Sequence, residues 1–518
     1  MVNIIKKFIR NYESNQKEKE KKEKKPQKKE FISSSLTQSL SFFKNKFGKS
    51  EDLTIRKLEI MDLESAIITM AGLVNKETLG NNVMNRISAD MQFNGTPIEK
   101  YEYLRDKIIS SCDIVQISTY EDALYMVMSG FALVVMDGCD RMLAIGVQGY
   151  SSRGISEPSS EVMQRGSREG FVEPLRINMT MIRRRIKNPT LKFETSKVGN
   201  ISKTEICFCY MEDKVSSDIL EKVKYKIQQI DLETIMAAGY VMPYLEEEND
   251  LSLFSSIGMT ERPDTVCGKL AEGRIAIIID GTPNVLIVPY LFTEYFQSMD
   301  DYAIRPYFAT LSRLIKYMGF LIASLLPGLY VGIGTFNPEL LPGPLLNKVA
   351  ISVGSTPFSL LFETLLIHFF YELMREAGLR LPKPLGHAVS IMGGLVIGDT
   401  AIKAGLIGAP TLMVVALTAL SSYVIPNLYE PIAMLRLLFI VAGGIMGIWG
   451  VMILFAAGLV NICAKSNYGV PFTAPISPFS TFGMRDVFIR AGWKILAMKD
   501  STVQYMPGAH PKRTKEKV

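Results

Sequence analysis

The sequence predicts an α+β, two-lobed cytoplasmic domain followed by an all-α polytopic membrane domain of four or five spans, one of them re-entrant if there are four. The block from Leu314 to Lys465 is nearly free of charge, whereas the roughly 300 residues before it have the mixed composition of a soluble protein. In those residues, apolar runs of strand length alternate with helix-like segments. A chain of 518 residues also exceeds one typical core, so we expect two or three folding units.

Residues 1–50 are predicted to form a disordered basic tail rich in Lys and Glu. The first 30 residues carry eleven Lys or Arg and five Glu, which accounts for the whole net charge of +6. Such a run cannot bury enough apolar surface to order itself, although attraction to anionic lipid is an alternative role. Because the start has no apolar stretch followed by a cleavage site, we expect no secretory signal and place the lobes on the cytoplasmic side.

Two related α/β lobes are predicted, over residues 51–155 and 156–300. Each is expected to end in a β-hairpin, because an Asp-Gly step separates two apolar runs and Gly accepts the positive φ of a tight turn. The steps are Asp137-Gly138 and Asp280-Gly281, and the five-residue stretches that end on them align without gaps. Chance resemblance between two buried hairpins is the alternative.

A basic cluster closes the helix predicted after the Ser- and Gly-rich loop Ser151–Gly170. Glu169 and Glu173 precede Arg183, Arg184 and Arg185, an order that complements the helix dipole. The alternative is a contact surface for a neighbouring subunit or for the membrane. The candidate subunit contacts are Arg168, Arg176, Arg183, Arg184 and Arg185.

The sequence contains no catalytic or metal-binding motif that we recognise. It has no Walker A loop, no G-x-G-x-x-G after a strand, no G-x-S-x-G and no H-E-x-x-H. Its six Cys include no C-x-x-C pair and its His number three, so the spacing expected of a zinc site is missing. We therefore expect no enzymatic activity, no cofactor and no metal.

Residues 301–313 are predicted to be an interfacial connector, because aromatic and charged residues alternate there as they do at lipid headgroups. Burial against the second lobe would give the same pattern.

The transmembrane domain is predicted over residues 314–465, and residues 466–518 are predicted to form a basic cytoplasmic tail. A cytoplasmic tail requires an even number of crossings, which four spans give if the Gly-rich segment Ala388–Leu406 is re-entrant, whereas five would place the tail outside.

Four ionisable residues inside the apolar block are candidates for an ion pathway. Charge in hydrocarbon is costly, so such residues usually face a bundle interior or water. Asp399 and Lys403 are four residues apart and could neutralise each other on one helical face. Structural pairing at subunit contacts is the alternative. The candidates are Glu363, Glu372, Asp399 and Lys403.

Several motifs resemble the A subunit of GerA-type spore germination receptors. The resemblance covers Leu53–Pro478 in the same order, with Ser167 standing where Pro is expected. The motifs are Arg165-Gly166-Ser167-Arg168-Glu169-Gly170-Phe171, Leu175–Asn178, Ile182–Ile186, Glu272–Arg274, Asp280–Pro283, Tyr302–Arg313 and Tyr468–Pro471.

The resemblance implies a multi-pass protein of the inner spore membrane that acts with a transporter-like B subunit and a lipoprotein C subunit. It also implies a homo-oligomeric ring with a central, nutrient-gated cation pathway and with both lobes in the spore core. Membrane lipid is the remaining expected partner, and nucleic acid is not expected. The competing functions are a secondary transporter and a scaffold subunit without its own pore.

Overall fold

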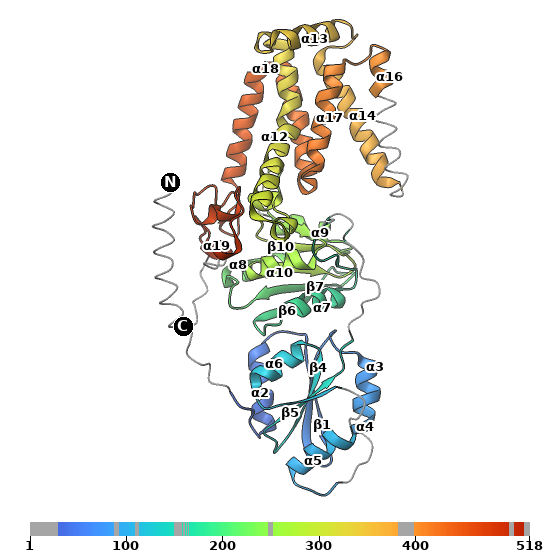
Figure 1. Cartoon of the computed structure of the whole chain (residues 1–518), viewed down its shortest axis with the longest axis vertical. Coiled ribbons are helices and arrows are strands. Elements are labelled where there is room, and N and C mark those ends of the chain that lie inside the picture. The colour runs from blue at the N-terminus through green and yellow to red at the C-terminus, as the bar shows by residue number, and fades with distance from the viewer. Residues whose placement is uncertain are drawn as a thin grey trace. The chain divides into compact units, whose positions relative to one another are not determined.

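The computed structural model describes residues 30–511 apart from 88–92, 109–112, 150–157, 159–160, 162, 164, 247–251, 382–397 and 497–501 (Figure 1). Contacts divide the chain into two compact units. The first is Met1–Ser151 with Ile186–Thr190, and the second is Ser152–Arg185 with Leu191–Val518.

The first unit contains an antiparallel five-stranded sheet of order β1-β2-β4-β5-β3. Alternate residues of its strands face opposite sides, so that Ile68 and Leu133 pack on one face while Ile67 and Val134 pack on the other. The strands are β1 (Leu53–Ile60), β2 (Leu63–Met70), β3 (Ile114–Ile117), β4 (Phe131–Met136) and β5 (Met142–Gly146).

Helices cover both faces of this sheet. One face packs against α2 and α6, and the other packs against short helices that include α5, which begins with a capping box at Thr96 and Glu99. The helices are α2 (Leu36–Phe47), α3 (Lys76–Leu79), α4 (Asn85–Ile87), α5 (Pro97–Tyr103) and α6 (Tyr120–Met128).

Helix α2 corrects the predicted limit of the N-terminal tail. Leu36, Leu40, Phe43 and Phe47 are buried at helical spacing, and they join the first core. Burial of the apolar face of α2 therefore stabilises this helix, although the sequence around it is polar. Residues 1–29 of the predicted tail lie outside the described residues.

The second unit contains a sheet of the same strand order, β6-β7-β9-β10-β8. The predicted hairpins are β4–β5 and β9–β10, which occupy the same place in the two sheets, with positive φ at Gly138 and Gly281. The strands are β6 (Leu191–Val198), β7 (Thr204–Met211), β8 (Gly258–Thr260), β9 (Ile275–Ile279) and β10 (Val285–Val288).

In both units the aspartate of the hairpin turn caps the helix that begins the unit. The Asp137 carboxylate accepts a hydrogen bond from the backbone N–H of Leu36, at 2.8 Å, and the Asp280 carboxylate accepts one from Leu175, at 2.9 Å. Helix α7 (Leu175–Arg185) is therefore the equivalent, in the second lobe, of α2 in the first. Helices α8 (Ser217–Gln228), α9 (Ala238–Leu245) and α10 (Pro263–Ala271) complete this lobe.

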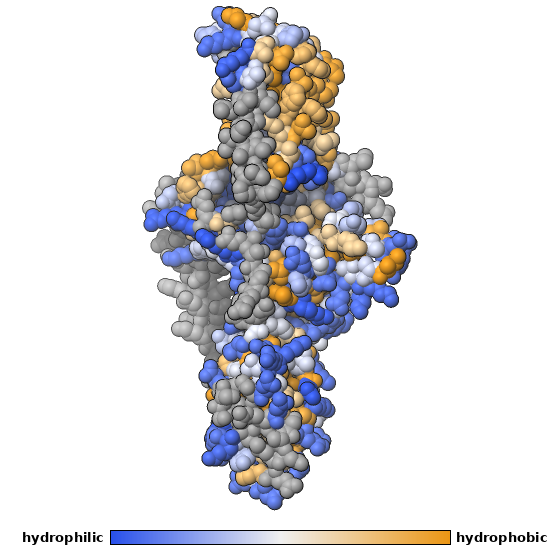
Figure 2. Space-filling model, turned by 90° about the vertical axis from the view of Figure 1, so that its right-hand side faces the viewer, coloured by the Kyte–Doolittle hydropathy of each residue, from blue (hydrophilic) through white to orange (hydrophobic). Residues whose placement is uncertain are grey.

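A helical block follows the second lobe within the same unit. Its outer surface carries many exposed apolar side chains, seen as orange in Figure 2. Its helices are α12 (Pro306–Phe336), α13 (Gly343–Gly354), α14 (Leu360–Arg380), α16 (Gly398–Lys403), α17 (Ala409–Tyr423) and α18 (Tyr429–Ala464).

Within the described residues, two helical stretches are long and apolar enough to cross a membrane, Pro306–Phe336 and Pro426–Ala464. The four or five predicted spans are therefore not confirmed. Helix α17 is apolar but short, and α14 carries several charged side chains along its length. Of the segment predicted to be re-entrant, residues 388–397 lie outside the described part of the chain.

Helices α12 and α18 pack closely where glycines meet. A Cβ on Gly328 would collide with the backbone of Phe439, and one on Gly443 would collide with the backbone of Gly328. Glycine therefore permits the backbone contact. Helix α18 also has a non-helical residue, Gly447, at φ 63°.

The segment after α18 is folded, which corrects the prediction that 466–518 is only a basic tail. Tyr468, Val470 and Val503 join the core of the second lobe. The hydroxyl of Tyr468 donates to the carbonyl of Leu245, and the N–H of Val503 donates to the carbonyl of Glu272. Residues 497–501 and 512–518 are outside the described residues.

Candidate functional site

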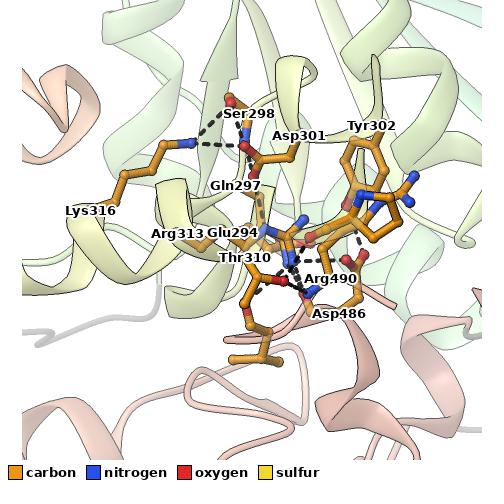
Figure 3. Close-up of polar contacts among 12 residues, drawn as sticks. Glu294, Gln297, Ser298, Asp301, Tyr302, Thr310, Arg313, Lys316, Asp486 and Arg490 are labelled. Carbon is orange, nitrogen blue, oxygen red and sulfur yellow. Dashed lines mark hydrogen bonds and ion pairs between the residues drawn. The ribbon is translucent and has the colours of Figure 1, made fainter. Parts of the chain in front are cut away.

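A buried charge network lies where α12 begins, in the predicted connector. Arg313 is fully buried, and its Nε and Nη1 atoms each lie 2.8 Å from a carboxylate oxygen, of Asp301 and Asp486 respectively. Figure 3 shows Lys316 reaching Asp301 from the other side, at 3.3 Å. The network joins the end of the second lobe, the first long helix and the C-terminal segment.

Tyr302 completes this network. Its hydroxyl donates to Asp486 over 2.7 Å, and burial together with the neighbouring Asp486 carboxylate raises the pKa of Tyr302 well above its usual value. The phenol therefore stays protonated and keeps its donor role. Tyr307 and Phe308, in contrast, are exposed. The connector is thus divided between residues buried against the lobe and residues open to the surroundings.

A second charge network lies nearby in the second lobe. One oxygen of Glu294 is 2.5 Å from both Lys269 Nζ and Arg274 Nη2, and Arg274 also pairs with Glu272. Burial alone would raise the pKa of Glu272, but Lys269 and Arg274 hold it below its ordinary value. The Glu272 carboxylate is therefore ionised, and both carboxylates are paired with cations inside the lobe.

The two networks border a cavity of about 630 Å³. Its walls come from the sheet edge, α10, the base of α12, the turn Val424–Asn427 and the C-terminal segment. Volumes of this size are usual for small-molecule sites. Among the described residues, no three His, Cys, Asp or Glu side chains are placed to hold a metal ion.

The ionisable residues of the helical block are separated rather than gathered. Glu363 is fully buried and accepts hydrogen bonds from the N–H of Gly408, at 2.7 Å, and from Thr356. Asp399 and Lys403 pair with each other on α16 at 2.6 Å, with side chains that are 57% and 75% exposed. Within the described part of the chain, Glu363 does not contact the pair of Asp399 and Lys403.

Glu372 forms a cluster that the sequence interpretation missed in part. Arg436 of α18 lies 2.6 Å from the Glu372 carboxylate, and Arg375 and the hydroxyl of Tyr429 bind it as well. Arg436 is 2% exposed. A single Arg within an apolar helix is itself a functional signal, and that signal could have identified Arg436 from the sequence.

The five candidate contact arginines occupy different environments. Arg183 is buried, donates to the carbonyl of Leu191 and lies over the ring of Phe193, so it offers no charge to a neighbouring surface. Arg184 and Arg185 both bind Glu169, at 2.5 Å. Arg176 is half exposed and pairs with Glu205 at 3.4 Å, and Arg168 is exposed.

Comparison with known proteins identifies the family. The model of the Bacillus/Clostridium GerA spore germination protein family matches residues 41–502. Spore germination protein KA of Bacillus subtilis (strain 168) is 36% identical over 89% of this chain and 85% of its own. The membrane protein YfkQ of the same organism is 32% identical over 91% of this chain and 92% of its own.

Similarity extends to a solved structure. It is the N-terminal domain of the A subunit of the Bacillus megaterium spore germinant receptor GerK3, 29% identical, with a TM-score of 0.41, covering 51% of this chain and 99% of that one. Together, the family match over residues 41–502 and the similarity to spore germination protein KA identify this chain as a member of the GerA family of spore germination proteins.

Proposed function

We propose that the protein is a membrane subunit of a nutrient germinant receptor that triggers spore germination. In this proposal it oligomerises into a nutrient-gated cation channel and acts with B and C partner subunits. Membership of the GerA family carries the proposal, because spore germination protein KA and other relatives are named for germination. The helical block, with apolar surfaces and buried ionisable residues, supports a membrane pathway.

The anchoring of both ends of the helical block supports an even number of crossings. At one end Arg313 binds Asp301, at the end of the second lobe, and at the other Lys465, next to the end of α18, donates to the carbonyl of Phe254. Both ends therefore attach to the second lobe. In the proposed topology four spans cross the inner spore membrane, with both lobes on the cytoplasmic side.

The surroundings of the carboxylates favour Glu363 over Glu372 as an ion-pathway residue. Glu372 is neutralised by Arg436 and Arg375, which suits a structural link between α14 and α18. Glu363 is fully buried, and no Lys, Arg or His in the described residues forms an ion pair with it. A permeating cation could therefore compensate its charge.

The experiment is cation flux into liposomes that contain the chain reconstituted with its B and C subunits. We expect nutrient to start potassium flux, Glu363→Gln to reduce that flux about tenfold or more, and the control Glu376→Gln to leave it unchanged. Normal flux in Glu363→Gln would remove this residue from the pathway. No nutrient-dependent flux in the assembled wild-type receptor would overturn the channel proposal.

A scaffold subunit without its own pore is the second candidate. The internal neutralisation of Glu372 by Arg436 and of Asp399 by Lys403 favours it, because paired charges can hold helices together without conducting ions. In that case the chain would still co-purify with the B subunit, while flux would depend only on substitutions in the partner.

A further inference from the structure

The cavity of the second unit has walls from parts of the chain that are far apart in sequence. Thr260 and Lys269 belong to the lobe, Lys316 to α12, Pro426 to the turn before α18, and Trp493 to the C-terminal segment. A molecule in the cavity would therefore contact the lobe, the helical block and the C-terminal segment at the same time.

The walls combine aromatic rings with several charges that pair with one another. Tyr290, Tyr302 and Trp493 supply rings, and the rings of Tyr302 and Trp493 lie 6.1 Å apart. Glu294 is neutralised by Lys269 and Arg274. The lining thus suits a ligand with a flat apolar body.

Two buried donors beside this cavity have no hydrogen-bond partner in the described chain. Thr502 lines the cavity, and its hydroxyl is unpartnered although the residue is 6% exposed. Arg490 is 1% exposed, and all three of its guanidinium nitrogens are unpartnered. Figure 3 accordingly shows no dashed line at its guanidinium group. Burying such donors without acceptors is unfavourable, and most of all for a charged group.

Arg490 lies directly behind two rings of the cavity wall. Its guanidinium carbon is 4.7 Å from the ring centre of Trp493 and 5.7 Å from that of Tyr302. Trp493 is 61% exposed, so its side chain has room to turn away from the guanidinium group. That movement would open Arg490 to the cavity.

We infer that the cavity binds a small anion with phosphate or carboxylate oxygens on an aromatic or apolar body. The anionic end accepts hydrogen bonds from Arg490 and Thr502, and the body stacks on Tyr302. Arg forms strong, often bidentate, hydrogen bonds with such oxygens. A free small molecule and a lipid headgroup share this chemistry. The inference concerns binding alone and stands whether or not the protein conducts ions.

The test uses Trp493 as its own reporter. The chain has two tryptophans, so Trp449→Phe leaves Trp493 as the fluorophore. The full-length Trp449→Phe protein is placed in phosphatidylcholine nanodiscs and titrated with phenyl phosphate and with inorganic phosphate. We expect a saturable change in Trp493 fluorescence with phenyl phosphate, and a weaker one with inorganic phosphate, which lacks the ring.

Variants then separate binding from folding. Arg490→Gln should weaken phenyl phosphate binding about tenfold or more, Thr502→Val about fivefold, and the exposed control Arg380→Gln not at all. Arg490→Lys keeps the charge and should restore part of the affinity. Melting temperature and hydrogen exchange of the second lobe must match the parent protein before affinities are compared.

Further outcomes identify the source or overturn the inference. If nanodiscs containing phosphatidylglycerol change Trp493 fluorescence in the parent and not in Arg490→Gln, the ligand is a lipid headgroup, and displacement of phenyl phosphate by that lipid supports the same site. Absence of saturable binding in every arm, or equal affinity in the parent and in folded Arg490→Gln, overturns the inference. Because no flux is measured, failure here leaves the channel proposal untouched.

Discussion

The two lobes share one strand order and the same turn-to-helix cap, yet they are completed differently. The first sheet is covered by helices from its own stretch of chain, whereas the second also requires Tyr468 and Val503 from beyond the helical block. The buried charges around Arg274 and Arg313 belong to the second unit. The same architecture is therefore a self-contained domain in the first unit and the base of a helical block in the second.

Disruption of the charge network at the base of α12 should destabilise the protein most. Arg313→Ala leaves Asp301 and Asp486 without their common partner, and removal of one side of a buried ion pair costs about 3–5 kcal/mol. We expect hydrogen exchange in residues 483–496 to rise roughly 100-fold or more, with the first unit unchanged. The exposed Arg380→Ala is the control, and equal protection in both variants would show that the network does not hold the segment.

A medium effect tests whether the two turn aspartates are equivalent. Asp137→Ala and Asp280→Ala each remove a cap from the first turn of a helix, at a cost of about 0.5–2 kcal/mol. We expect faster amide exchange at the start of α2 in the first variant and of α7 in the second, by similar factors. Loss of protection in one helix only would show that the two turn aspartates are not equivalent.

The smallest effect concerns acid stability in the second unit. Burial would raise the pKa of Glu169, but Arg184 and Arg185 bring it below its ordinary value of 4.5. A depressed pKa means that the stabilisation is present above about pH 4.5 and is lost as the pH falls through the lower folded value. We expect Glu169→Gln to flatten the acid limb of the unfolding curve, by less than about 1 kcal/mol because the pair is partly exposed.

The acid titration is followed by hydrogen exchange in peptides of the second unit. Peptides of the first unit serve as the internal reference. An unchanged acid limb in Glu169→Gln would mean that the arginines stabilise the helix end without this carboxylate.

Local signals explain what could be predicted from the sequence. Both hairpins were found because an Asp-Gly turn is encoded by adjacent residues. Helix α2 was missed because the composition of the tail hid four apolar residues at helical spacing, from Leu36 to Phe47. Its pattern was present in the sequence and would have been detected by periodicity alone.

Long-range contacts explain what could not be predicted. Arg313 and Asp486 are 173 residues apart, and Tyr468 and Leu245 are 223 apart, so no local pattern indicates that they meet. The pairing of Glu372 with Arg436 depends in the same way on how α14 packs against α18. Among the candidate ion-pathway residues, the pair of Asp399 and Lys403 could be predicted from its spacing of four residues. The contacts of Glu363 with Gly408 and of Glu372 with Arg436 could not.

The contribution of Val503 to the second core has a consequence for biosynthesis. The chain supplies most of this lobe first, then the whole helical block, and only afterwards the residues that fill the remaining core positions. This core can therefore be completed only after residue 503 has left the ribosome. Synthesis of the whole helical block thus precedes completion of the lobe.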